Sequence, residues 1–381
     1  MNAARPTRSP GSSRLSSMLS ADVIVNNILL AALVALIVYF SFSSPYFFTL
    51  SNFTVLLTNY AAIGVVAAVM TPLMIAGHVD LSVGSNIAFS AMIAALAITV
   101  FGVHPVVGIL VGVGSGACIG AVNGLACGAL RLSPIIVTLG MLSLLRGLTL
   151  LINPTEVYGL GDTFFYIGNG AFLGVPILLW VVVLAFAAAA LFISTTVWGR
   201  YVYAVGVNPQ AAFLAALPVR RLLFSLYVAT GAAAGVAGVL LAARLDGVSP
   251  GALGLQMELQ ALTIILLGGV AFAGGRGRIF GVVTAWVFLG VLENGLTLLN
   301  VPPFIQMVAS GLALVFAASI DAVGTYVAPR MARRRAVAEQ IEVARQRASA
   351  PRSLLRRASR RRDRRRAEAV PAENCVTAFH A

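Results

Sequence analysis

Residues 257–281 read MELQALTIILLGGVAFAGGRGRIFG. The segment opens with Glu258, continues without charge through the glycine pair at residues 268–269, and closes in glycines and arginines at residues 274–278. An apolar run of this length with arginines at one end only is typical of a helix that crosses a bilayer and leaves its positive charge in the cytoplasm. Paired glycines allow the backbone to bend or another helix to approach closely. The segment therefore predicts a membrane helix over residues 258–275 with a glycine break and a basic exit, and its structural glycines are Gly268, Gly269, Gly274, Gly275 and Gly277.

The composition of the chain excludes an ordinary soluble domain. Of the 381 residues, 59% are hydrophobic and 10% are charged, and the mean hydropathy is +0.93. Soluble domains carry about 25% charged residues. The formal net charge of +13 is a property of the C-terminal tail, because fifteen of the 26 basic residues follow Pro329. We therefore expect an all-α polytopic membrane protein with no nucleic-acid partner.

The absence of Lys and the small number of Cys residues limit the chemistry that the chain can perform. The chain contains no Lys, and a phosphate-binding loop of the Walker type needs a Lys to reach the β- and γ-phosphates. Any ATPase activity is therefore expected in a separate subunit, and the chain itself is not expected to be an enzyme. Cys118, Cys127 and Cys375 are too few and too scattered for a disulfide framework or a metal cluster. The sequence predicts neither a metal nor a cofactor.

Ten apolar segments reach membrane-spanning length, and they predict about ten transmembrane helices. They lie at about residues 23–42, 53–76, 84–102, 105–130, 135–152, 172–194, 222–243, 258–275, 279–299 and 304–327. Together they define a transmembrane domain at residues 23–327, between an N-terminal arm at residues 1–22 and an Arg-rich tail at residues 328–381. The tail is expected to be disordered and to lie near anionic lipid head groups.

The charges between these segments predict that both termini are cytoplasmic. On that topology the inner connections hold Arg131, Arg200, Arg220, Arg221, Arg276 and Arg278. The outer connections hold Glu156, Asp162, Asp246 and Glu258 against the single Arg244. This is the asymmetry of the positive-inside rule. Arg146 lies within the fifth segment, so we expect it to have an internal partner or to face an aqueous cavity.

The link between the second and third segments reads GHVDLSVGS at residues 77–85 and contains no basic residue. Asp80 or Ser82 is suited to cap the following helix by accepting hydrogen bonds from its free N–H groups. Alternatively, the turn lies partly within the bilayer, where irregular backbone is tolerated only against protein or a water-filled cavity. In that case it lines the transport path.

Glycine patterns in the fourth segment predict packing and an internal repeat. Glycine recurs every four residues from Gly108 to Gly128, which favours a groove for close helix contact. The sequence GAVNGL at residues 120–125 is echoed by GVLENGL at residues 290–296 in the ninth segment. Because these helices are expected to run in opposite directions, the echo hints at an inverted repeat of the kind that builds transport folds.

The link between the sixth and seventh segments contains the signal of a short helix. Asn208 followed by Pro209 is typical of an N-cap and a first helical position, and Pro218 is expected to end the helix about two turns later. An apolar helix of two turns has little stability alone in water. Phe213 and Leu214 therefore need a surface, either on this chain's own membrane helices or on a partner protein.

Three stretches, residues 77–85, 206–221 and 258–281, resemble the sugar-type permease subunits of bacterial ABC importers, the ribose, xylose and galactoside group. The first is similar to the family's GGIDLSVGS, the second to GxNPxAAxxxGI, and the third to VLGGxxxxGGRG. The resemblance covers roughly residues 25–327, and the three stretches are specific for the family when they are taken together.

The resemblance implies a ten-helix permease in the bacterial plasma (inner) membrane that imports a pentose, a hexose or a related polyol. Its implied partners are cytoplasmic ATP-binding-cassette ATPase subunits, an external sugar-binding protein and a second permease chain, as a homodimer or a heterodimer. The loop that couples to the ATPase would contain Gly206, Asn208, Pro209, Ala211, Phe213, Leu214 and Leu217.

Two of these stretches depart from the family pattern, the first at His78 and Val79 and the second at Ala216 and Leu217. His78 places a side chain where the family has glycine, and it is expected to narrow the path or to change sugar preference. Ala216 and Leu217 replace a common glycine and isoleucine, which is expected to alter the fit to the ATPase without abolishing it.

An uncharged sugar needs hydroxyl and amide partners more than it needs charges. The candidates for the translocation path, chosen by their expected depth in the membrane, are Asn59, Asp80, Ser82, Ser85, Asn86, Asn123 and Asn294. Polar residues in membrane helices also join helices together, and this is the alternative role for each candidate.

Two other functions fit the same segments. A branched-chain amino-acid permease of the same superfamily shares the architecture. An ion-coupled secondary transporter would require an acid within the membrane, for which Asp80, Glu293 and Asp321 are available, although each lies near a segment end.

Overall fold

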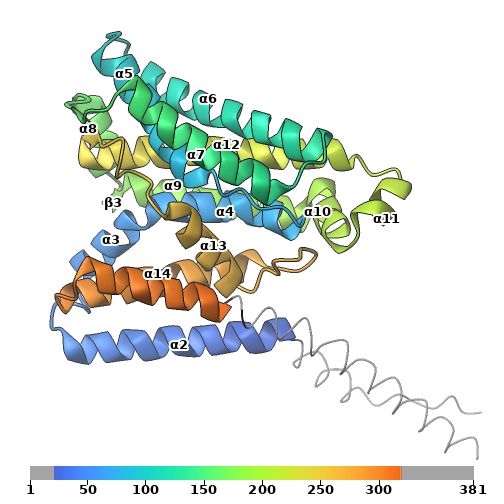
Figure 1. Cartoon of the computed structure of the whole chain (residues 1–381). Coiled ribbons are helices and arrows are strands. Elements are labelled where there is room, and N and C mark those ends of the chain that lie inside the picture. Colours follow the sequence, from blue (N-terminus) through green and yellow to red (C-terminus); the bar gives the residue numbers. More distant parts are fainter. Residues whose placement is uncertain (1–20, 318, 320–381) are drawn as a thin grey trace, which may run out of the picture. The chain divides into compact units, whose positions relative to one another are not determined.

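The computed structural model describes residues 21–317 and residue 319, and all of them belong to one compact unit made almost entirely of helices (Figure 1). The N-terminal arm expected before residue 21 and the Arg-rich tail expected after residue 327 lie outside the described residues. The helices are α2 (Ala21–Ser43), α3 (Leu50–Asn59), α4 (Ala61–Ile75), α5 (Val83–Thr99), α6 (Pro105–Gly124) with the π-helix η1 (Leu125–Ala129), α7 (Pro134–Ile152), α8 (Asp162–Asn169), α9 (Ile177–Thr195), α10 (Val197–Val207), α11 (Pro209–Leu214), α12 (Val219–Leu245), α13 (Met257–Leu267) and α14 (Ile279–Leu298). A further apolar helix covers Pro303–Ala317.

The described strands form two short antiparallel pairs. In one pair β1 (Val157–Tyr158) lies beside β4 (Gly247–Val248), and in the other β2 (Ala171–Phe172) lies beside β3 (Val175–Pro176). Each strand has two residues. They close the links between long helices and do not form a layer of the fold.

The helices confirm a multi-pass membrane fold of the all-α class. Five of them are long and apolar enough to cross a membrane, and α3 with α4 makes a sixth candidate, bent by 53°. Four shorter apolar helices complete the set, so each of the ten predicted segments contains one apolar helix or the bent pair. The predicted inverted repeat stays a prediction.

One predicted helix is shorter than the sequence indicates. The segment expected to be helical over residues 258–275 is helical only as α13, which ends at Leu267. Gly269 and Gly274 adopt left-handed φ angles of 81° and 83°, which end the α-helical hydrogen-bond pattern at little cost for glycine. Residues 268–278 therefore form a loop, and α13 is a half-length helix.

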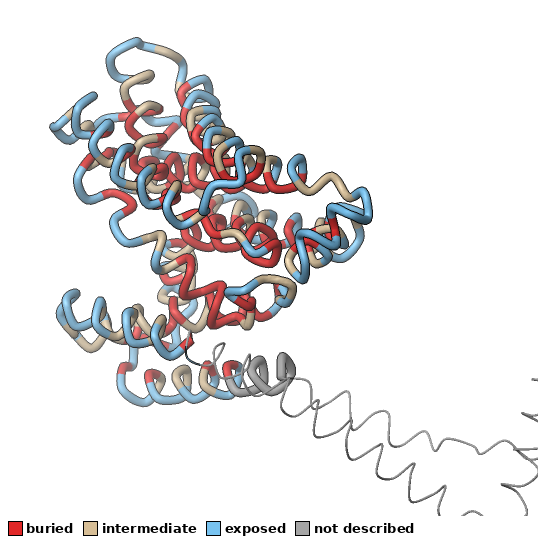
Figure 2. Tube along the Cα trace, turned by 45° about the vertical axis from the view of Figure 1, so that its right-hand side comes forward, coloured by how far each residue is buried: buried red, intermediate tan, exposed pale blue. Residues whose placement is uncertain are grey.

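The most enclosed span is α12, which is 72% buried across its most apolar window, whereas that of α7 is 17% buried. Figure 2 shows the same contrast, with buried residues along the middle of the bundle and exposed residues on the outer helices. The exposed side chains on the outer helices include Leu110, Leu151 and Leu184. Lipid tails are as apolar as leucine, so such a surface is stable within a bilayer.

The glycine stripe of α6 packs directly against α12, as its spacing predicts. A Cβ atom on Gly120 would collide with the carbonyl oxygen of Tyr227, and a Cβ atom on Gly116 would lie 2.9 Å from the Cα atom of Gly235. Gly231 on α12 meets the backbone of α6 in the same way. Glycine on both helices therefore lets the two backbones touch.

The predicted internal partner of Arg146 is also present. Its Nη1 atom donates to the carbonyl oxygens of Leu253 at 2.9 Å and of Pro250 at 3.4 Å. These carbonyls belong to the loop before α13, so the charge on α7 is held by backbone dipoles.

A leucine substitution on the stripe tests this packing. We expect Gly120→Leu to lower the thermal midpoint of the detergent-solubilised protein clearly, because overpacking of a close contact costs roughly 1–3 kcal/mol. The matched control is Gly114→Leu on the same helix, where a Cβ atom has nothing within 4 Å. Equal midpoints for the two variants would contradict the contact.

Candidate functional site

The three motif segments, residues 77–85, 206–221 and 258–281, meet at the C-terminal end of α4. The amide of Gly275 donates to the carbonyl oxygen of Ile75 at 2.7 Å. A Cβ atom on Gly206 would collide with that same carbonyl oxygen and with the Gly275 amide. A Cβ atom on Gly274 would lie 2.8 Å from the Cα atom of Gly77. We call this contact of Ile75, Gly77, Gly206, Gly274 and Gly275 the glycine junction.

Two further contacts fix the loop that follows α13. The hydroxyl of Tyr203 on α10 donates to the carbonyl oxygen of Gly277 at 2.8 Å. A Cβ atom on Gly268 would lie 2.6 Å from the amide nitrogen of Val282, so α14 approaches α13 at this point. The predicted structural glycines thus allow close approach between elements from three parts of the chain.

Asp80 and Ser82 form a buried polar network with Asn123. Asp80 Oδ1 accepts from the Ser82 amide at 2.9 Å and from the Ser82 hydroxyl at 2.6 Å. Asn123 Nδ2 donates to Ser82 Oγ at 2.9 Å and to Asp80 Oδ2 at 3.3 Å. The exposed fractions of all three residues are at most 1%. Asp80 therefore stabilises the turn itself and ties it to α6.

The capping alternative is only partly correct. Ser82 is the N-cap residue of α5, and its side chain makes no capping hydrogen bond. Asp80 bonds the amide of Ser82 and so closes the turn before the helix. Asn123 Oδ1 is buried and has no hydrogen-bond partner among the described residues.

Ser85 and Asn86 extend the polar groups along α5. The Ser85 hydroxyl donates to the carbonyl oxygen of Ser82 at 3.2 Å. Asn86 Nδ2 donates to the carbonyl oxygens of Gly116 at 3.3 Å and Gly231 at 3.4 Å, while its Oδ1 accepts from Ser90 at 3.0 Å. Asn86 thus bonds to α6 and α12 where their glycines pack.

Asn59 and Asn294 lie apart from this network. Asn294 forms two reciprocal amide hydrogen bonds with Asn52, at 2.9 and 3.0 Å, which tie α14 to α3. Asn59 is the exposed last residue of α3. The structure therefore brings together five of the seven path candidates, namely Asp80, Ser82, Ser85, Asn86 and Asn123.

His78 reaches α12. Its Nδ1 atom lies 3.3 Å from the hydroxyl of Tyr227, and that hydroxyl donates to the carbonyl oxygen of Val79 at 3.4 Å. Tyr227 is fully buried. Sequence reasoning missed Tyr227 and Tyr203, because a single tyrosine in an apolar run gives no local signal of a long-range partner.

The short helix α11 forms as predicted, with one difference at its end. The side chain of Asn208 accepts from the Ala211 amide at 2.9 Å, and Pro209 follows at the first helical position. The helix ends at Leu214, before Pro218, because Ala216 has a left-handed φ of 59°. The helix α10 before it was not predicted, although Thr196 caps it by accepting from the Gly199 amide at 2.9 Å.

The side chains of α11 divide into a buried and an exposed set. Ala212 is buried, and Leu217 after the helix packs against the hydrophobic core. Phe213 and Leu214 are 54% and 83% exposed. These two side chains therefore remain uncovered by the chain's own described helices.

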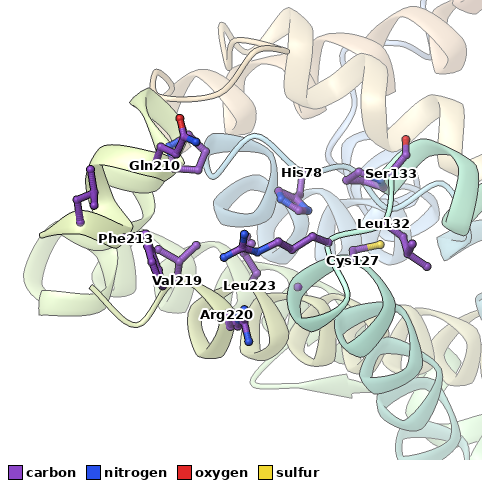
Figure 3. A pocket seen from close by; sticks show the side chains of 14 residues that line it. His78, Cys127, Leu132, Ser133, Gln210, Phe213, Val219, Arg220 and Leu223 are labelled. Atoms are coloured by element: carbon purple, nitrogen blue, oxygen red, sulfur yellow. The ribbon is translucent and has the colours of Figure 1, made fainter. Parts of the chain in front are cut away.

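A cavity of about 570 Å³ lies between α11, η1 and the start of α12. Figure 3 shows His78 and Cys127 facing Gln210 and Phe213 across it. The Arg131 guanidinium lies 5.7 Å from the centre of the Phe213 ring, within the range of a cation–π contact. His78 thus lines this cavity, two residues before Asp80 in the chain.

Comparison with known proteins identifies the family. Residues 52–318 match the family model described as "Branched-chain amino acid transport system / permease component". The ribose import permease protein RbsC of Escherichia coli (strain K12) is 36% identical over 297 residues, which cover 77% of this chain and 92% of that protein. No solved structure matches.

Two other relatives carry the names of different sugars. The L-arabinose ABC transporter permease protein AraH of Azospirillum brasilense is 36% identical over 283 residues, covering 74% of this chain and 83% of that protein. The fructose import permease protein FrcC of Rhizobium meliloti is 33% identical over 288 residues, covering 72% and 79%. This multi-pass membrane chain therefore belongs to the permease family of bacterial ABC importers that includes these sugar permeases.

Proposed function

We propose that the chain is the membrane-spanning permease subunit of an ABC importer that carries a pentose, a hexose or a related polyol. ATP hydrolysis in a partner subunit drives the transport. The observation that carries this proposal is the glycine junction, which joins the loop bearing α11 to α13 and to the turn before α5. Backbone contacts of this kind suit a protein in which the movement of a partner subunit at the membrane surface displaces the membrane helices.

The polar groups within the bundle support a neutral substrate over an amino acid. An amino acid carries an ammonium and a carboxylate, and a site for it needs charges of both signs that remain available. Asp80 is enclosed by donors from Ser82 and Asn123, and Arg146 is engaged by backbone carbonyls. Asn123 Oδ1, which has no hydrogen-bond partner among the described residues, can accept a hydrogen bond from a sugar hydroxyl.

The exposed apolar side chains of α11 support docking of an ATPase subunit. When ATP closes the ATPase pair, α11 and α10 move with it. Gly206, near the C-terminal end of α10, is in close backbone contact with Ile75 and Gly275. The movement therefore reaches α4 and α13. The helices then open on the other side of the membrane and release the sugar.

The assembly proposed here contains a second permease chain, ATP-binding-cassette ATPase subunits and an external sugar-binding protein. Both termini lie in the cytoplasm of a bacterial cell, with the chain in the inner membrane. This orientation places the arginines at residues 131, 220, 276 and 278 inside. It also places α10 and α11 inside and α8 outside, in agreement with their location at opposite ends of the bundle (Figure 1).

The docking role of α11 is tested by charging its exposed face. We expect the double variant Phe213→Asp/Leu214→Asp to lose most ATP hydrolysis stimulated by the loaded binding protein, because the docking surface loses its apolar contacts. The measurement is ATP hydrolysis in nanodiscs that hold the full complex.

The matched control for α11 is Phe172→Asp/Leu173→Asp, an aromatic and aliphatic pair that is 60% and 79% exposed in the β2–β3 hairpin. Stimulated hydrolysis that persists in the α11 variant would show that α11 packs elsewhere and would remove the support for ATPase coupling.

A single methyl group added at Gly206 tests the glycine junction. We expect Gly206→Ala to keep ATPase binding but to reduce sugar uptake per ATP hydrolysed at least several-fold, because α10 must shift away from Ile75 and Gly275. Gly147→Ala on α7 is the control, since a Cβ atom there has nothing within 4 Å. Normal coupling in Gly206→Ala would mean that the junction carries no movement.

A further inference from the structure

A second polar cluster surrounds Glu293 on α14, apart from the Asp80 network. The Ser310 hydroxyl donates to Glu293 Oε1 at 3.0 Å, and Gln260 Nε2 donates to the same oxygen at 3.4 Å. No hydrogen bond from a described residue reaches Glu293 Oε2, and Glu293 makes no ion pair within the described part of the chain. We call Tyr60, Gln260, Glu293 and Ser310 the Glu293 cluster.

Tyr60 contributes a hydroxyl that is available for a ligand. It lies at the 53° break between α3 and α4, where its backbone carbonyl accepts from Trp286 Nε1 at 2.8 Å. Its hydroxyl is buried and makes no hydrogen bond of normal length with a described residue, although the Glu293 carboxylate interacts with it both electrostatically and as a long hydrogen-bond acceptor. An unpaired buried hydroxyl is costly, so a partner at this point would stabilise it.

Two of the elements that carry the cluster are discontinuous helices. Gln260 belongs to the first turn of the half-length helix α13, and Tyr60 occupies the break in the second span. Broken and half-length helices near the middle of transport folds expose backbone and side-chain groups for substrate. Along α14, Glu293 lies about 20 Å from the end that meets α13 at Gly268, at 1.5 Å per residue.

Helix association alone explains the neighbouring asparagines but not this cluster. Asn52 and Asn294 satisfy each other fully with two amide hydrogen bonds. Glu293 instead combines a membrane carboxylate without an ion pair among the described residues and an adjacent tyrosine hydroxyl that has no partner at normal hydrogen-bond length. An acid in a membrane helix is costly unless it serves a function or meets water.

We propose that the Glu293 cluster is a sugar-binding site of the permease, which holds the sugar after the binding protein releases it. A sugar hydroxyl is both a donor and an acceptor. One hydroxyl donates to Glu293 Oε2, and another accepts from the Tyr60 hydroxyl. The inference rests on the proposed function and names the residues of the permease that first receive its substrate on the outer side.

The sharpest variant is Tyr60→Phe, because it removes only the hydroxyl without a protein partner. Proteoliposomes with the full importer are supplied in turn with radiolabelled D-ribose, L-arabinose, D-fructose and D-allose, and sugar uptake per ATP hydrolysed is measured. We expect Tyr60→Phe to lower this ratio roughly five- to tenfold, the effect of one lost hydrogen bond. Glu293→Gln is expected to lower it at least tenfold.

The controls separate binding from stability. Tyr39→Phe removes an exposed tyrosine hydroxyl on α2, and Thr297→Val removes a hydroxyl that donates to the Glu293 backbone carbonyl but not to its carboxylate. Both should transport normally. Tyr60→Phe should keep the thermal midpoint of the wild type, so a midpoint that falls together with uptake would assign Tyr60 a structural role and overturn the proposal.

A second measurement does not depend on the folding of Glu293→Gln. In a variant with Cys118 and Cys375 replaced by alanine, Ser310→Cys is labelled from outside by a membrane-impermeant thiol reagent, with Thr297→Cys as the matched position. We expect the sugar-loaded binding protein to slow labelling of Ser310→Cys only. Unchanged uptake in Tyr60→Phe and Glu293→Gln, or unprotected Ser310→Cys, overturns the site. A wild type that imports neither these sugars nor any of a wider panel of pentoses, hexoses and polyols overturns the proposed function itself.

Discussion

The contact between the carbonyl oxygen of Ile75 and the amide of Gly275 is the constraint on which the rest of the structure depends. The carbonyl lies at the end of a fully buried helix, and an unpaired backbone group there would be costly within a membrane. Gly275 satisfies it at 2.7 Å, and Gly206 lies close beside both groups because it has no Cβ atom. Since the junction consists of backbone and not of flexible side chains, a displacement of α10 passes to α4 and to the loop after α13.

The number and position of the apolar helices could be predicted because a bilayer requires a minimum apolar length and leaves charge in the loops. The start of α11 could also be predicted, since Asn208 and Pro209 act on the nearest residues only. The end of α13 could not, because residues 261–275 contain no charge and no proline, and their break depends on left-handed glycines and on contact with α14. Long-range pairs such as Asn52 with Asn294, which are 242 residues apart, leave no local signal.

The polar candidates for the path were chosen by their expected depth in the membrane. Depth alone does not determine whether a side chain is free to bind a ligand. Asp80 was a candidate because it is an acid in an uncharged turn, but its two oxygens are engaged by Ser82 and Asn123. Its immediate role is to hold the turn before α5 against α6. His78, which departs from the family glycine, lines the open cavity beside α11 and contacts Tyr227. It makes no hydrogen bond with Asp80, Ser82 or Asn123.

The helix α13 connects the glycine junction with the proposed sugar site at Glu293. Its C-terminal end meets α14 and continues into the glycine junction, while its first turn carries Gln260 beside Glu293. With eleven residues, α13 spans only about half of a bilayer. If the sugar site proposed above is correct, we expect a shift at Gly275 to displace α13, and with it Gln260, relative to α14. The hydrogen bond between Gln260 and Glu293 is long, at 3.4 Å, and we expect such a displacement to weaken it. Movement of α10 would thereby change the polar surroundings of Glu293 without any direct contact between α10 and α14.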